Sequence, residues 1–252
     1  TKTAYYQGTQ LNRYPWDATV KVMNPLSSDL GVMRQTLLFG GLESIVRNVH
    51  RKNPNLKFFE VGNCYRFLAE KRTPEHPINA YKQSHHLGLW VTGKRVEGSW
   101  AHPDEDSSFF ELKAYVENIL RVCGLKYHTV VVKTSDNNIF SKGLRYETHQ
   151  GDLLAEAGIV DLKIKKAFEL NQDVFFADID LTDLARTIRK IKFEFKEVSK
   201  FPAVSRDLAL LIDKNVEFSQ IEQIARKTEK KLLKRVELFD VYEGKNLPSG
   251  KK

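Results

Sequence analysis

The stretch from Asn24 to Asn48 constrains the fold more than any other part of the sequence. Its first residues, NPLSSD, contain a turn signal and residue types that cap helix N-termini. From Met33 onward, apolar residues recur at helical spacing, at Leu37, Leu38, Leu42, Ile45, Val46 and Val49. The pattern therefore predicts a polar turn followed by one long amphipathic helix, with Arg34 solvated near its start.

Two adjacent glycines, Gly40 and Gly41, interrupt this predicted helix. Each glycine in a helix interior costs roughly 1 kcal/mol relative to alanine. The pair therefore indicates either a break in the helix or a close approach of its backbone to another element.

Composition narrows the class of protein. The chain has 252 residues, enough for one large domain or two smaller ones, and no apolar run approaches the roughly 20 residues that span a bilayer. A net charge of +8 favours a polyanionic partner. Cys64 and Cys123 form no CxxC pair, which disfavours a zinc site. Two lone thiols fit the reducing cytoplasm, although a single disulfide between them remains an alternative. A start without Met and a polar end predict a piece of a longer chain.

The first three quarters of the chain carry several strands in succession between two strong helices. Residues 56–67 read as a hairpin or bulged strand pair that turns at Gly62-Asn63, followed by a loop over 69–84. Further strands are predicted at 17–23, 85–93, 127–133 and, as short segments, within 139–181, and further helices at 107–123 and 182–190. This order favours an α+β domain on a mostly antiparallel sheet.

A histidine pair and a cluster of three acids resemble metal or cation sites in composition, but a structural role is favoured for both. His85 and His86 are adjacent in a strand and so point to opposite faces, which favours one buried and one exposed histidine over a shared metal. Asp104, Glu105 and Asp106 precede a helix start, where acids are favoured by the helix dipole, so capping is expected.

The last quarter of the chain has a different pattern. A strand is predicted at 207–212, a helix at 217–231 and a second strand at 233–244, which is the first half of a ferredoxin-like unit. The helix has an apolar face of Phe218, Ile221, Ile224, Ala225 and Thr228, and a basic face of Arg226, Lys227, Lys230 and Lys231.

Five segments in order resemble the phenylalanyl-tRNA synthetase beta subunit family, in its C-terminal part. They are NPLSSDLGVMRQTLLFGGL, LKFFEVGNCYRF, SFFELKAYVENIL, SKFPAVSRDLALLID and VELFDVYEG. The resemblance implies two domains. Residues 1–190 are expected to form a class II synthetase-like antiparallel sheet flanked by helices, without catalytic activity. Residues 194–252 are expected to form a ferredoxin-fold anticodon-binding domain that is incomplete at its C-terminus.

The resemblance also implies what the whole enzyme does. In this family an (αβ)₂ heterotetramer in the cytoplasm joins phenylalanine to tRNA(Phe) with ATP and Mg²⁺, and the alpha subunit carries the active site. The expected partners are therefore the alpha subunit, a second beta subunit and tRNA(Phe), with no membrane. ATP and Mg²⁺ belong to the whole enzyme, and this part of it is expected to bind neither.

Residue by residue, the class II motifs are degenerate. Arg66 stands where the family of class II enzymes places the arginine that holds the α-phosphate, but Phe67 replaces the acid expected after it. The glycine-rich pattern that supplies a second arginine is absent from 139–190. The sequence therefore predicts no catalytic or metal-binding residue here. The residues assigned to a degenerate motif or a subunit interface are Arg34, Gly40, Gly41, Glu60, Gly62 and Arg66.

The candidate tRNA-binding residues lie in the last quarter of the chain. They are Lys200, Phe201, Arg206, Arg226, Lys227 and Lys230. Basic side chains attract phosphate and aromatic rings stack on bases, although a solvated face is the default interpretation of such a run of charge. Two other functions stay open, a self-sufficient class II enzyme and a free-standing RNA-binding or scaffold protein built from synthetase-like domains.

Overall fold

The computed structural model describes residues 1–125, 129–189, 191, 197, 200–244 and 247–252. The chain divides into two compact units, Thr1–Glu194 and Phe195–Lys252. No helix among the described residues is long and apolar enough to cross a bilayer.

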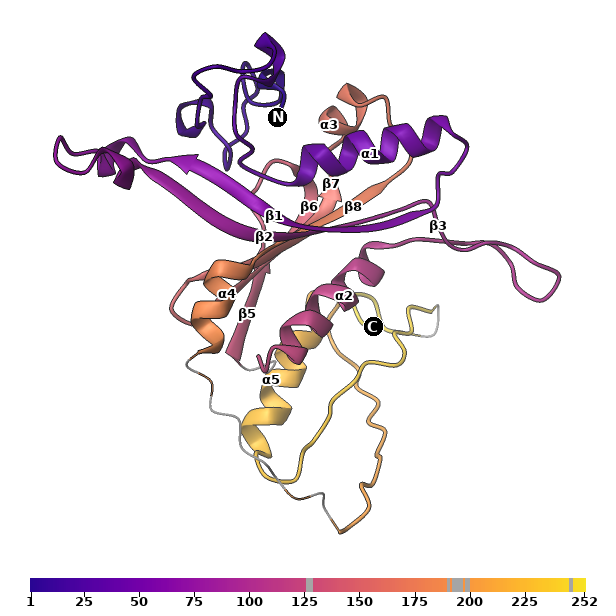
Figure 1. Cartoon of the computed structure of the whole chain (residues 1–252). Coiled ribbons are helices and arrows are strands. Elements are labelled where there is room, and N and C mark those ends of the chain that lie inside the picture. Colours follow the sequence, from indigo (N-terminus) through magenta and orange to yellow (C-terminus); the bar gives the residue numbers. More distant parts are fainter. Residues whose placement is uncertain (126–128, 190, 192–196, 198–199, 245–246) are drawn as a thin grey trace. The chain divides into compact units, whose positions relative to one another are not determined.

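One antiparallel sheet organises the first unit (Figure 1). Its six strands lie in the order β1-β2-β8-β7-β6-β5, so β1 and β5 form the edges. The strands are β1 (Leu56–Phe67), β2 (Tyr81–Thr92), β5 (Val130–Thr134), β6 (Phe140–Thr148), β7 (Leu153–Val160) and β8 (Val174–Asp180). A separate small ribbon pairs β3 (Lys94–Val96) with β4 (Glu105–Asp106). The α+β class with an antiparallel sheet is confirmed.

Helices cover both faces of this sheet (Figure 1). Helices α1 (Leu38–His50) and α3 (Leu162–Ala167) lie on one face, with the N-terminal segment. Helices α2 (Phe109–Val122) and α4 (Leu181–Ile188) lie on the other. Short 3-10 turns occupy Thr3–Tyr5, Trp16–Ala18, Ser28–Leu30, Ala69–Lys71 and Pro77–Ala80.

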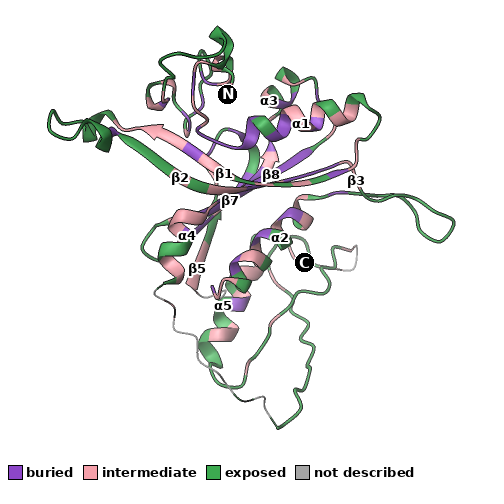
Figure 2. Cartoon of the chain, viewed as in Figure 1, coloured by how far each residue is buried: buried purple, intermediate pink, exposed green. Residues whose placement is uncertain are grey.

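The sheet separates two hydrophobic cores, because alternate strand residues point to opposite faces. Trp90 and Phe176 face each other across β2 and β8 and pack with α1. Their neighbours Val91 and Phe175 face the α2 and α4 side. The buried residues accordingly concentrate along the middle of the sheet and the inner faces of the helices (Figure 2).

Two predictions for the region around Asn24–Asn48 need correction. Helix α1 begins only at Leu38, because residues before it are held beside β1, where the Tyr65 N–H donates to the Arg34 carbonyl at 2.8 Å. The strand predicted at 17–23 is a single antiparallel bridge between Lys21 and Val32. The core positions Leu38, Leu42 and Ile45 are buried as the helical spacing predicts.

The hairpin predicted at 56–67 is wrong, since β1 runs unbroken through Gly62 and Asn63. Every residue of β1 pairs with β2, from Leu56 opposite Thr92 to Phe67 opposite Tyr81. The ladder hydrogen bonds to β2 outweigh the local turn signal. The predicted loop 69–84 therefore ends early, where β2 begins at Tyr81.

The remaining elements of the first unit follow the sequence pattern more closely. Helices predicted at 107–123 and 182–190 appear as α2 and α4. Strand β5 begins at Val130, and residues 127–128 of the predicted strand lie outside the described residues. The acids expected to cap α2 instead brace the β3–β4 ribbon, where Asp104 pairs with Lys94 at 2.7 Å and Glu105 with Arg95 at 2.9 Å.

The second unit contains one helix, α5 (Phe218–Thr228), among its described residues. A reciprocal capping box between Glu217 and Gln220 starts it, and it ends before Lys230. The strands predicted at 207–212 and 233–244 are not formed in the described residues. A strand needs a neighbouring backbone, and near these segments the described residues pair through the isolated bridge of Asp213 with Lys251.

Candidate functional site

A polar cleft of about 210 Å³ opens on the α1 face of the sheet, beyond the hydrophobic core. Alternation along the strands places it there, because Cys64 and Arg66 of β1, and Ser84 and His86 of β2, share a face with Trp90. Its acidic lining residues are Glu156, Asp178, Asp180 and Asp183, and its basic ones are Arg13, Arg66, Lys82 and His86.

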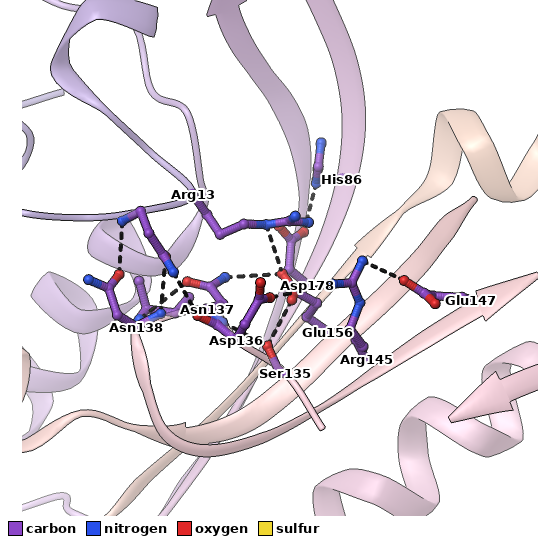
Figure 3. A network of polar contacts seen from close by, with 12 residues as sticks. Arg13, His86, Ser135, Asp136, Asn137, Asn138, Arg145, Glu147, Glu156 and Asp178 are labelled. Atoms are coloured by element: carbon purple, nitrogen blue, oxygen red, sulfur yellow. Dashed lines mark hydrogen bonds and ion pairs between the residues drawn. The ribbon is translucent and has the colours of Figure 1, made fainter. Parts of the chain in front are cut away.

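Two of these acids, Glu156 and Asp178, are directly opposite each other on β7 and β8. Like charges in this position destabilise a sheet unless other groups compensate them. Glu156 is 4% exposed and accepts hydrogen bonds from Ser135 and Asn137, and Arg13 lies 3.5 Å from it. Figure 3 shows these groups converging on Glu156.

Asp178 is compensated by His86. The imidazole Nδ1 lies 2.7 Å from Asp178 Oδ1, and Nε2 lies 2.8 Å from the Ser84 hydroxyl and 3.8 Å from Asp180. Burial of the imidazole opposes its charged form, but Asp178 and Asp180 outweigh that effect and raise the pKa of His86. His85 is exposed, so the two histidines take the opposite faces that the sequence predicts.

Arg66 points into this cleft but is engaged by the protein. Its Nη2 donates to the backbone carbonyl of Arg13, and its Nε is buried without a hydrogen-bond partner. Arg13 in turn faces Glu156, so both guanidinium groups have protein neighbours. The arrangement can hold the N-terminal segment against the sheet.

Arg34, Glu60 and Gly62 come together outside this cleft. Arg34 donates to Glu60 Oε1 at 2.6 Å and to the Asn63 carbonyl at 2.8 Å. A Cβ on Gly62 would lie 2.1 Å from the Arg34 guanidinium, so glycine leaves the room that this side chain needs. Arg34 is therefore an ion-paired residue that ties the segment before α1 to β1, and not the solvated residue expected.

The two glycines of α1 have different surroundings. A Cβ on Gly41 would lie 2.1 Å from Cε2 of Trp90, which explains the glycine as a close approach of the helix to the sheet. Gly40 is exposed, and such a Cβ there would have no atom within 4 Å apart from its chain neighbours and the backbone of its own helix. The glycine pair thus reflects close packing at one position, and the helix does not break.

An asparagine clasp joins the N-terminal segment to the turn before β6 (Figure 3). The backbone N–H groups of Asn12 and Asn138 each donate to the other's side-chain oxygen, at 3.0 and 3.1 Å. Both side-chain amides also donate to backbone carbonyls, those of Asp136 and Gln10. The clasp positions Arg13, the next residue, over the cleft.

The candidate tRNA residues of the second unit are mostly on its surface. Lys200, Phe201, Arg206, Lys227 and Lys230 are exposed. Arg226 is engaged on the helix itself, where its Nη2 lies 2.7 Å from Glu222. Lys230 follows the end of α5, so the predicted basic face is shorter than expected and Ile224 of the predicted apolar face is 65% exposed.

Sequence reasoning missed Arg13, Glu156 and Asp178. One signal was available: Glu156 and Asp178 are single acids inside the otherwise apolar strands LLAEAGIV and VFFADID. A buried acid must have partners, so such a residue marks a polar site. Among the residues that the structure describes, no group of three or more His, Cys, Asp or Glu side chains is arranged to hold a metal ion.

Comparison with family models identifies the class of protein to which the chain belongs. Residues 1–181 match the family model described as "Phenylalanyl tRNA synthetase beta chain CLM domain", and residues 199–252 match "Ferredoxin-fold anticodon binding domain". The first of these models describes part of an aminoacyl-tRNA synthetase. The chain belongs to the phenylalanyl-tRNA synthetase beta chain family.

Similar sequences agree with this assignment. A phenylalanine–tRNA ligase beta subunit of Bacteroides thetaiotaomicron is 57% identical over all of this chain, and one of Porphyromonas gingivalis is 49% identical. In both comparisons the chain spans 30% of the length of the relative. A solved pyrrolysyl-tRNA synthetase from Desulfitobacterium hafniense aligns with 68% of this chain and 53% of its own, at 13% identity and a TM-score of 0.47.

Proposed function

We propose that this chain acts within a phenylalanine–tRNA ligase, where it supports subunit assembly and contacts tRNA(Phe) while the alpha subunit carries the active site. The whole enzyme would use ATP and Mg²⁺ in the cytoplasm and assemble as an (αβ)₂ tetramer. Residues 1–190 form its non-catalytic synthetase-like domain in this proposal, and residues 194–252 its anticodon-binding domain.

One observation carries the non-catalytic assignment. The cleft beside Arg66 is lined by four carboxylates, and its two arginines are engaged by Glu156 and by the Arg13 carbonyl. Adenylate formation builds negative charge on phosphate, which needs cations close by. The four carboxylates offset the four basic side chains of the cleft, and both arginines are already engaged, so the cleft offers no excess of positive charge for a triphosphate.

Two surfaces support the assembly and tRNA roles. The Arg34–Glu60 pair with Gly62 leaves Arg34 one-third exposed beside the edge strand β1, where a partner subunit can reach it. Exposed Lys200, Phe201, Arg206, Lys227 and Lys230 combine positive charge with an aromatic ring, which is how single-stranded RNA is bound. Arg226 contributes less, because it is paired with Glu222.

Phenylalanine-dependent ATP–pyrophosphate exchange tests the proposal. The chain by itself is expected to give no exchange, and alpha with full-length beta is expected to give full activity. Arg66→Ala in full-length beta should leave the exchange rate of the assembled enzyme within about twofold, because the Arg66 guanidinium is engaged by the backbone carbonyl of Arg13. Exchange by this chain alone, abolished by Arg66→Ala, would establish a self-sufficient class II enzyme instead.

A further inference from the structure

Residues 94–106 form an arm that projects from the first unit, here called the Trp100 arm. It starts with β3 next to the end of β2 and returns through β4 just before α2 (Figure 1). Residues 95–106 are all exposed, as Figure 2 shows for the long loop beyond the β3 label. Neither hydrophobic core includes any residue of the arm.

The arm is braced along its length despite its exposure. Near its base, Lys94 pairs with Asp104 and Arg95 with Glu105. At its tip, Ser99 and His102 exchange backbone hydrogen bonds of 2.8 and 3.3 Å. Asn55 anchors the base, since it accepts from the Lys94 N–H at 2.8 Å and donates to Glu97 at 2.6 Å. The arm therefore presents its tip in a defined conformation.

Trp100 stands at this tip and is 100% exposed. Single exposed apolar residues are common on protein surfaces, but tryptophan is highly buried on average. Trp90 of the same chain is 1% exposed, and Trp16 packs against the core. A fully exposed tryptophan on a braced arm resembles the aromatic anchor residues that dominate the binding energy of protein interfaces. Because the arm is already ordered, less conformational entropy is lost when it binds.

Charge indicates the kind of partner. The Trp100 arm contains four acids, Glu97, Asp104, Glu105 and Asp106, against the two basic residues Lys94 and Arg95 at its base, which gives it a net charge of −2. This acidity contrasts with the net charge of +8 of the whole chain. An acidic arm is repelled by the phosphates of RNA and is attracted to basic protein surfaces.

We propose that the Trp100 arm docks on a second protein chain, with the Trp100 indole in an apolar pocket and basic side chains around its rim. This inference rests on the proposed function, in which that second chain is the alpha subunit. The arm is then a contact for assembly, separate from the Arg34–Glu60 pair and from the tRNA-binding residues.

The test measures the association of alpha with full-length beta that carries Trp100→Ala, Trp100→Phe or the control Phe110→Ala. Phe110 is also an exposed aromatic, at 75%, but lies on α2 outside the arm. Trp100→Ala should weaken association by about thirtyfold, as hot-spot residues do, and Trp100→Phe should restore part of it. Phe110→Ala should leave association within about twofold. The thermal midpoint of free beta should not change in any variant.

Three other outcomes would overturn either the arm proposal or the proposed function. Equal affinity of wild-type and Trp100→Ala beta for alpha overturns the arm proposal and leaves the proposed function intact. Unchanged association with weaker tRNA binding in Trp100→Ala also overturns it, in favour of base stacking. No association of wild-type beta with alpha overturns the proposed function itself, independently of the variant.

Discussion

At Gly41 the backbone of α1 meets the indole of Trp90. A Cβ on Gly41 would lie 2.1 Å from the ring, whereas a Cβ on Gly40 would have no atom within 4 Å apart from its chain neighbours and the backbone of α1. We expect Gly41→Ala to destabilise the protein by about 2 kcal/mol, because overpacking a well-packed core forces shifts. Gly40→Ala should stabilise it by up to about 1 kcal/mol through helix propensity. Urea unfolding of both variants checks this, and equal effects of the two would contradict the packing described.

His86 makes the stability of the fold depend on pH. Its pKa is raised by Asp178 and Asp180 above the ordinary value. A histidine with a raised folded-state pKa stabilises the fold fully below its unfolded pKa of about 6.5, and this stabilisation is lost as pH rises through the folded-state pKa. The difference in unfolding free energy between wild-type and His86→Gln should therefore shrink between acidic and alkaline pH. A difference that grows with pH would contradict this sign.

At the scale of elements, the N-terminal segment depends on a few polar contacts to stay beside the sheet. The Asn12–Asn138 clasp supplies four hydrogen bonds. Asn138→Ala should lower the free energy of unfolding by about 1 kcal/mol, a typical net value for lost hydrogen bonds. It should also speed proteolysis within residues 1–32. Asn118→Ala is the control, since Asn118 accepts one bond from Arg121 on α2. Equal protease sensitivity of both variants would show that the clasp does not hold the segment.

Elements with a local sequence pattern could be predicted from the sequence, and elements that depend on distant pairing could not. Helices α2 and α4 have a repeating apolar spacing that is local to the helix, so the sequence predicts them within a few residues. Strand β1 was wrongly divided at Gly62-Asn63, because a turn signal is local while the ladder to β2 is not. Arg34 was wrongly placed in a helix for the same reason: its carbonyl is bound by Tyr65, a residue of another element.

For the whole molecule, the positive charge and the surface lysines of the second unit predict salt-dependent tRNA binding. Each phosphate contact releases counterions, so the logarithm of the affinity should fall linearly with the logarithm of salt concentration. Lys227→Ala should lower this slope by about 1, and so should Lys230→Ala. Arg226→Gln should change it less, because Arg226 is paired with Glu222. Binding assays from 50 mM salt upward test this, and a slope near zero would exclude the basic surface as the tRNA site.

The sequence by itself determined the class of fold, the two principal helices of the first unit, and the family, since five ordered segments carry that resemblance. These features depend on residue order and on local periodicity. Only the tertiary structure decided the cleft, because its partners come from distant segments: His86 and Asp178 are 92 residues apart. It also decided that Gly41 packs closely while Gly40 does not, and that Arg66 is engaged by Arg13. Such contacts depend on how strands pair, and no local pattern encodes that pairing.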